Sequence, residues 1–332
     1  MEEESSIRNR IRYNKKEIVD KIKTTGRYES GTTKIIKWED DMNTDTEMYI
    51  VQNKYNKIPF IGVVNYAFKR EGYCLNTYQN GDEYFGYYSN DLRNKQGLYI
   101  YKPKQILDKM ILRQYYFGLW ENDKKQGRGI YLWLKENNYN LNNRLYNPFL
   151  KFDNVNFNAY IGEFENNKFS KGTLLKKEGD KYFVYHGQFD NKNLKKNGKD
   201  CFYYNSNLEQ IFFGTFKNDN FVEGYAGKFN NEGELDNIIK FQNKKIIEKE
   251  QLYELEEFKN VTKKIVLFRN IIMMKDYFGI LNNVFKDAIQ FKNENMNDIN
   301  LLNSDKYIDL MEIEASYNQV SIFRDIEKHL NQ

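Results

Sequence analysis

A short pattern of aromatic residues and glycines recurs along this chain of 332 residues, and it restricts the possible folds more than any other feature. The pattern is aromatic-x-Gly-x-aromatic, followed by a polar pair and a further glycine. Its clearest copy reads YFGLWENDKKQGRG, from Tyr116 to Gly129. The copies are centred on Gly62, Gly86, Gly118, Gly162, Gly187 and Gly214. Such self-similarity predicts stacked supersecondary units, which bury a continuous core only together.

The residues of each copy predict one β-hairpin. Residues i, i+2 and i+4 of a strand share a face, so the two aromatic residues and the glycine between them lie side by side. Because glycine has no side chain, we expect a ring from the neighbouring repeat to fill the slot. The polar pairs suit two-residue turns with positive φ, although Lys192 tolerates that conformation poorly. These pairs are Asn90-Asp91, Asn122-Asp123, Asn166-Asn167, Asn191-Lys192 and Asn218-Asp219.

These residues resemble the MORN repeat (membrane occupation and recognition nexus), whose motif is approximately Tyr-x-Gly-x-Trp-x-Asn-Gly-x-x-x-Gly-x-Gly. The resemblance covers roughly residues 58 to 233 in six degenerate copies, and the copy at Tyr116 to Gly129 matches almost residue for residue. The other copies depart from the motif, since the second glycine of Gly-x-Gly survives only at Gly129. The resemblance implies an elongated, non-catalytic scaffold at membranes, cytoskeletal rims or cilia, which binds a partner helix or dimerises.

The predicted fold class is mainly β: an elongated antiparallel sheet of stacked hairpins with a C-terminal α-helical extension. Residues 1–57 are predicted to be an irregular N-terminal cap, with a short helix over 7–22 and strands over 34–38 and 48–51. The repeats occupy 58–233, with inserted loops at 102–114 and 134–158.

A helical tail is predicted over 244–332, because apolar residues there recur at intervals of three and four. One set of such residues is Val261, Ile265, Phe268 and Ile272. The other set is Leu310, Ile313, Tyr317, Val320, Phe323, Ile326 and Leu330. The two helices either pack on the sheet or on each other, or hold a partner helix or a second copy of the chain.

Composition excludes several classes of protein. The net charge of +4 is too small for a dedicated nucleic-acid binder. Two cysteines, Cys74 and Cys201, do not make a disulfide framework or a zinc motif. The first residues lack a signal-peptide pattern, and no apolar run approaches the length of a membrane span. We therefore expect a cytoplasmic protein, at the cytoskeleton or at the membrane periphery.

The sequence contains no recognisable catalytic constellation. It has two histidines, His186 and His329, which is too few for a histidine-based triad or metal cluster. His186 is predicted to face away from the aromatic residues and to be exposed, and His329 to lie in a last helical turn. P-loop and Rossmann fingerprints are absent. We expect no catalytic residue, metal, cofactor or small-molecule substrate, and no enzymatic activity.

Two sets of side chains are candidates for binding. The second aromatic residues of the repeats form either core between neighbouring repeats or an open groove for an amphipathic helix. They are Tyr88, Trp120, Phe164, Phe189 and Phe216, with Tyr84, Tyr116, Tyr160, Tyr185 and Phe212 beside them. Lysines near the hairpin ends are either solvated or in contact with anionic lipid. They are Lys124, Lys125, Lys171, Lys195 and Lys196.

The leading functional hypothesis is a scaffold or adaptor that binds a partner protein, most simply a helix, at a membrane-associated or cytoskeletal structure. A ciliary or axonemal structural component is one form of it. The alternatives are a peripheral module that binds anionic lipid and a regulatory subunit of an enzyme.

Overall fold

The strands and one helix of this protein fall into two compact units in a computed structural model. The structure describes residues 28–30, 33–41, 46–53, 60–64, 69–107, 110–137, 156–190, 194–242, 245–247, 256–274, 279, 281 and 283–285. The described part of unit 1 lies within residues 28–102 and 115–124. The described part of unit 2 lies within residues 103–114 and 125–285.

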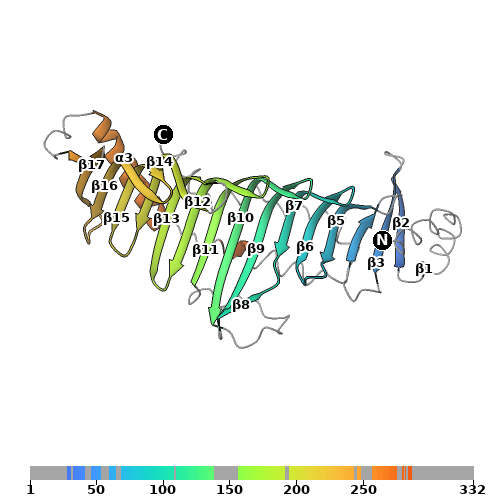
Figure 1. Ribbon diagram of the computed structural model, residues 1–332. Helices are drawn as coiled ribbons and strands as arrows, with labels where there is room; N and C mark the ends of the chain where they lie inside the picture. The colour runs from blue at the N-terminus through green and yellow to red at the C-terminus, as the bar shows by residue number, and fades with distance from the viewer. Residues whose placement is uncertain are drawn as a thin grey trace. The chain divides into compact units, whose positions relative to one another are not determined.

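Unit 1 is an antiparallel meander, in which each strand pairs with the next along the chain (Figure 1). The last of these strands, β7, pairs with the end of β9. The strands are β1 (Tyr28–Ser30), β2 (Thr33–Asp41), β3 (Thr46–Asn53), β4 (Phe60–Val64), β5 (Arg70–Thr77), β6 (Glu83–Ser89), β7 (Leu92–Ile100) and β9 (Met110–Glu121). The predicted strands at 34–38 and 48–51 are confirmed as β2 and β3.

Unit 2 has the same kind of arrangement from β10 to β18, with each strand antiparallel to the next. Its strands are β8 (Lys104–Leu107), β10 (Lys124–Asn137), β11 (Asn156–Glu165), β12 (Lys168–Glu178), β13 (Lys181–Phe189), β14 (Lys196–Asn205), β15 (Gln210–Lys217), β16 (Asn220–Phe229), β17 (Leu235–Gln242) and β18 (Lys245–Ile247). β8 pairs with the start of β9. The helix α3 (Glu256–Met274) follows the last strand.

The hairpin turns adopt the conformation that their sequences require. Both central residues have positive φ at four of the predicted pairs, for example Asn122 at 48° and Asp123 at 66°. Asn and Asp adopt this left-handed backbone conformation more readily than most other residues. The resulting two-residue turn matches the right-handed twist of the two strands that it joins. Residues 191–193, which include the fifth predicted pair, lie outside the described residues.

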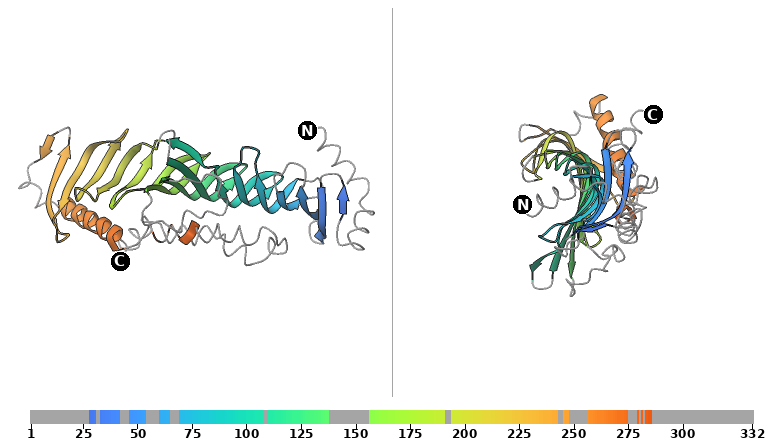
Figure 2. Two further views of the ribbon diagram at one scale, coloured as in Figure 1. Left: turned by 90° about the horizontal axis from the view of Figure 1, so that it is seen from below. Right: turned by 90° about the vertical axis from the view of Figure 1, so that its right-hand side faces the viewer.

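The helix α3 lies against one face of unit 2, where it contacts β14 and β16, and we call this face of the sheet the helix face (Figure 2). The Phe268 ring of the helix stacks on Phe202 of β14, with the ring centroids 4.5 Å apart. Phe258 approaches Tyr225 of β16 at 6.2 Å. The predicted apolar stripe of this helix is confirmed, since Val261, Ile265, Phe268 and Ile272 are all buried.

Three sequence predictions need correction. The predicted loop at 102–114 contains β8 and the start of β9, which pair with each other. The sheet does not end at residue 233, because β17 and β18 follow, and β18 lies inside the predicted helical tail. In the predicted loop at 134–158, both ends are strand. Outside the described residues lie 138–155, the predicted helix at 7–22 and the predicted second helix with His329.

Candidate binding surface

Five of the six repeat glycines lie beside another glycine on a neighbouring strand, whereas Gly62 pairs with Cys74. In unit 1 the paired residues are Gly86, Gly97 and Gly118. In unit 2 they are Gly129, Gly162, Gly172 and Gly187. A further pair, Gly214 and Gly224, lies on β15 and β16. We call each of these series a glycine row.

The row of Gly214 and Gly224 has Phe212 and not tyrosine at the first aromatic position, and a Cβ on Gly214 would meet the backbone of Glu223. In the other two rows, the slot above the glycines is filled differently from our expectation. It holds the first tyrosine of the same strand, whose hydroxyl donates to the backbone carbonyl three residues further on. The donor–acceptor distances are 3.1 Å for Tyr84, 2.8 Å for Tyr116, 2.8 Å for Tyr160 and 2.8 Å for Tyr185. A Cβ placed on Gly162 would lie 2.5 Å from the Tyr160 hydroxyl. Glycine is therefore required at this position because the tyrosine two residues earlier on the same strand occupies the space of a side chain.

Rings of the neighbouring repeat pack against the edges of these tyrosines. Tyr84 meets Trp120 with centroids 5.5 Å apart, and Tyr160 meets Phe189 at 5.3 Å, both edge to face. Such T-shaped pairs are favoured by the ring quadrupoles. All five predicted partner-binding rings are buried in this packing: Tyr88, Trp120, Phe164, Phe189 and Phe216. Trp120, Phe189 and Phe216 contact a tyrosine of the preceding repeat and so connect successive hairpins.

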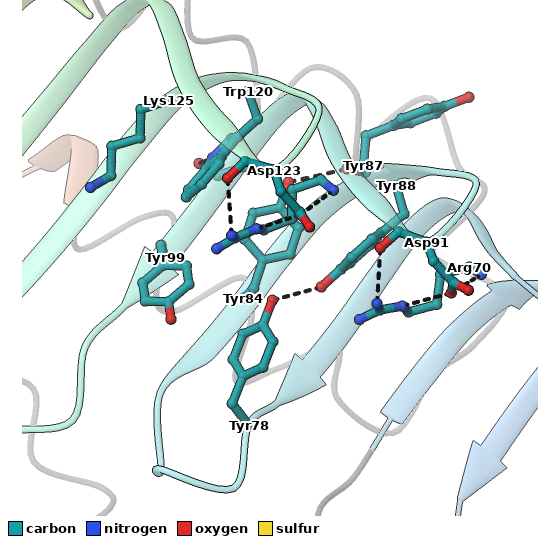
Figure 3. Close-up of polar contacts among 12 residues, drawn as sticks. Arg70, Tyr78, Tyr84, Tyr87, Tyr88, Asp91, Tyr99, Trp120, Asp123 and Lys125 are labelled. Carbon is teal, nitrogen blue, oxygen red and sulfur yellow. Dashed lines mark hydrogen bonds and ion pairs between the residues drawn. The ribbon is translucent and has the colours of Figure 1, made fainter. Parts of the chain in front are cut away.

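Turn residues fix the register of successive hairpins in unit 1 (Figure 3). The Arg93 backbone N–H donates to Asp123 Oδ1 at 2.7 Å, and the Arg93 Nε donates to the same oxygen at 2.9 Å. The Arg93 guanidinium also lies 4.2 Å above the centroid of the Trp120 ring. Arg70, Asp91 and Tyr88 repeat this arrangement one hairpin earlier. These charged groups are engaged in the packing of the repeats.

In unit 2, the face opposite the helix face has a row of apolar side chains across the strands, and we call it the aromatic face. Strand register places these residues beside one another: Tyr131, Tyr160, Leu174, Tyr185, Tyr203, Phe212, Ala226 and Ile239. From Tyr203 onward the members are half-buried. Phe221 and Phe241 lie on the same face and are also half-buried, with their centroids 6.2 Å apart. Ile246 of β18 pairs with Phe241 and is 63% exposed.

Three lysines of unit 2 lie over rings of the aromatic face. The Lys125 ammonium is 4.9 Å from the centroid of Tyr131, and the Lys196 ammonium is 4.7 Å from that of Tyr203. Lys176 lies over Phe183 at 5.6 Å. A cation is attracted to the negative face of an aromatic ring. Partial burial in this position lowers the pKa of Lys196.

The five lysines proposed as lipid contacts do not share one surface. Lys125 and Lys196 lie on the aromatic face, as their ring contacts show. Lys171 is two residues before Thr173 and lies on the helix face, where its charge acts on His186. Lys124, which belongs to unit 1, is exposed, and Lys195 is half-buried.

His186 faces away from the aromatic face as expected, but the prediction that it is exposed is wrong. Its ring is buried, and Nδ1 lies 2.8 Å from the Thr173 hydroxyl. Burial, with a smaller effect of Lys171, lowers the pKa of His186 to about 3. The imidazole is therefore neutral at physiological pH and has a structural hydrogen bond.

Metal ligands and thiols can be located among the described residues. Among those residues, His, Cys, Asp and Glu side chains nowhere gather in threes as a metal site requires. Cys74 and Cys201 are buried and are not bridged to each other. Of the helices that are described, none is long and apolar enough to span a membrane.

Comparison with known proteins adds no relative: a scan against protein-family models found no match, and neither did a search of curated proteins.

Sequence reasoning missed most of the accessible rings. Tyr203, Phe221 and Phe241 lie outside the aromatic-x-Gly-x-aromatic pattern, on second strands or beyond the repeats. The strand register that brings them beside Phe212 contains bulges, at Gly198 to Cys201 and at Thr215 to Phe216. The alternation of polar and apolar residues in each second strand was the signal that could have identified them.

Proposed function

We propose that this protein is a non-catalytic scaffold or adaptor that binds a partner protein through the aromatic face of unit 2. The observation that supports the proposal most is the accessibility of the rings Tyr203, Phe212, Phe221 and Phe241 on that face. The opposite face is occupied by α3 of the same chain. Large apolar side chains that remain accessible on a folded protein mark sites of interaction.

The resemblance of the repeats to the MORN family supports the same proposal. Members of that family are scaffolds at membrane rims, cytoskeletal structures and cilia, so we place this protein at the cytoskeleton or membrane periphery. An anionic-lipid module is less well supported, because the five lysines that the sequence suggested for it are divided between the aromatic face, the helix face and unit 1.

Proximity labelling in the native cell tests the proposal. We compare the wild-type protein with a Phe212→Gln variant, whose half-buried ring is lost, and with Lys171→Gln on the helix face as the matched control. We expect Phe212→Gln alone to lose the enriched partner proteins. Equal enrichment for all three proteins would contradict binding through the aromatic face. Melting curves and circular dichroism of each variant separate loss of binding from loss of folding.

A further inference from the structure

The charge of the aromatic face points to the chemistry of its occupant. Register and alternation place six lysines on it: Lys125, Lys135, Lys176, Lys181, Lys196 and Lys228. In the regularly paired parts of β10 to β17, the acidic side chain on this face is Glu178, whose carboxylate is 2.8 Å from Lys176. At one turn, Asp219 lies 3.9 Å from the Lys196 ammonium. The face therefore has an excess of positive charge although the whole chain is nearly neutral.

In unit 2, the turn at Asn166-Asn167 lacks the carboxylate that Asp219 provides at the turn of Asn218-Asp219. The Lys125 backbone N–H donates to Asn167 Oδ1 at 2.8 Å, just as the Lys196 N–H donates to Asp219 Oδ1 at 2.8 Å. In unit 1, Asp123 and Asp91 occupy the same turn position. The asparagine provides the same backbone hydrogen bond without the negative charge. The turn beside Lys125 is thus more positive than its equivalents.

The geometry of the apolar row fits a helix laid across the strands. Tyr203, Phe212, Ala226 and Ile239 lie on four successive strands, which are about 4.8 Å apart. One turn of an α-helix rises about 5.4 Å, so a helix across the row presents roughly one apolar residue to each strand. Lys196 lies on β14 between this row and the end of the sheet that holds the Asn218-Asp219 turn. Lys228 lies on β16 two residues after Ala226, on the opposite side of the row. Carboxylates on both flanks of such a helix would meet ammonium groups.

We infer that the partner segment of the aromatic face is an acidic amphipathic helix, with an apolar stripe for the rings and Asp or Glu on its flanks. This inference rests on the proposed function and specifies the partner. A protein segment fits better than a lipid surface for two reasons. The Lys125, Lys176 and Lys196 ammoniums lie against ring faces, close to the sheet, instead of projecting from it. Lys171 adds its charge to the opposite face.

Binding of designed peptides to the full chain tests the inference. The first probe is an amphipathic peptide of about 18 residues, or five helical turns, with a leucine and phenylalanine stripe and glutamates on its flanks. Its twin has lysine in place of every glutamate. Fluorescence anisotropy measures both affinities at low and high salt. The protein variants are Lys196→Glu with Lys228→Glu, and, as matched control, Lys171→Glu. Sedimentation with phosphatidylcholine–phosphatidylserine vesicles runs in parallel.

We expect the acidic peptide to bind at least about tenfold more tightly than its basic twin, since several ion pairs change sign. The paired charge reversal abolishes this preference, Lys171→Glu retains it, and salt weakens it. Equal affinity for the two peptides would overturn the acidic specificity and leave the proposed function intact. Absence of peptide binding overturns the inference, and vesicle binding lost in the charge reversal would then assign the face to lipid. The proximity-labelling experiment tests the proposed function separately, since equal partner enrichment for the wild type and Phe212→Gln would contradict it.

Discussion

The contact between each tyrosine and the glycine row predicts a specific energetic coupling, and Gly97 offers its clearest test. A Cβ added to Gly97 would meet only Tyr84 among its nearest atoms, with Cε2 and Cζ both at 2.5 Å. Overpacking of a filled core costs about 1–3 kcal/mol. Because the opposing Tyr84 ring is fully buried and its hydroxyl is bonded to the Tyr87 carbonyl, Gly97→Ala should fall at the upper end, near 3 kcal/mol.

Removal of the ring should relieve this clash. Tyr84→Leu alone costs roughly 2–4 kcal/mol, from lost burial and the lost hydrogen bond. The double variant should be less destabilised than the sum of the two changes by about 2 kcal/mol, a coupling expected only of residues in contact. Urea unfolding of the wild type, both single variants and the double variant measures it. Gly179→Ala is the control, because no atom lies within 4 Å of its added Cβ and only its φ of 60° opposes the change.

Additive effects, within about 0.5 kcal/mol, would refute the reasoning. They would mean that the approach of the Tyr84 ring does not require glycine at position 97. A cost for Gly179→Ala equal to that for Gly97→Ala would lead to the same conclusion.

Three further predictions concern the turns, the buried histidine and the helix. Asp123→Ala should cost about 1–3 kcal/mol in thermal or urea unfolding, because the Arg93 backbone and guanidinium both lose their acceptor; Asp123→Asn should cost less, and equal costs would contradict this role. Since the pKa of His186 falls from 6.5 to about 3 on folding, the unfolded chain binds the extra proton between these values, and stability should decrease by up to about 1.4 kcal/mol per unit as pH falls. In His186→Gln, the free energy of unfolding should depend less on pH over this range. The same pH dependence in the variant and the wild type would contradict the prediction. Phe268→Ala should cost about 3–5 kcal/mol and increase hydrogen exchange at Phe202; unchanged exchange there would argue against docking of α3.

The hairpins were predictable because their determinants are local. The Asn-Asp and Asn-Asn pairs specify turns with positive φ, and the glycines specify a close approach, so both follow from a few adjacent residues. The helical stripe at Val261 to Ile272 is a local periodicity of the same kind. These signals gave the order of the hairpins and the position of α3.

The accessible surface was not predictable in the same way, because it depends on which aromatic side chains are buried under the side chains of neighbouring strands. The sequence left open whether Trp120 and Phe216 form core or line a groove, and in the structure the tyrosine of the preceding repeat packs against each. His186 is similar: its burial depends on Thr173, which lies on the neighbouring strand. Burial of this kind is a property of non-local packing, which a single sequence shows only through the register of its strands.

Site-specific photo-crosslinking in the native cell tests the central claim most directly. A photoreactive phenylalanine analogue replaces either Phe212, on the aromatic face, or Lys171, exposed on the helix face. The account predicts a crosslinked partner protein from position 212, and none from position 171. The same partner captured equally from both positions, or from position 171 alone, would contradict binding through the aromatic face.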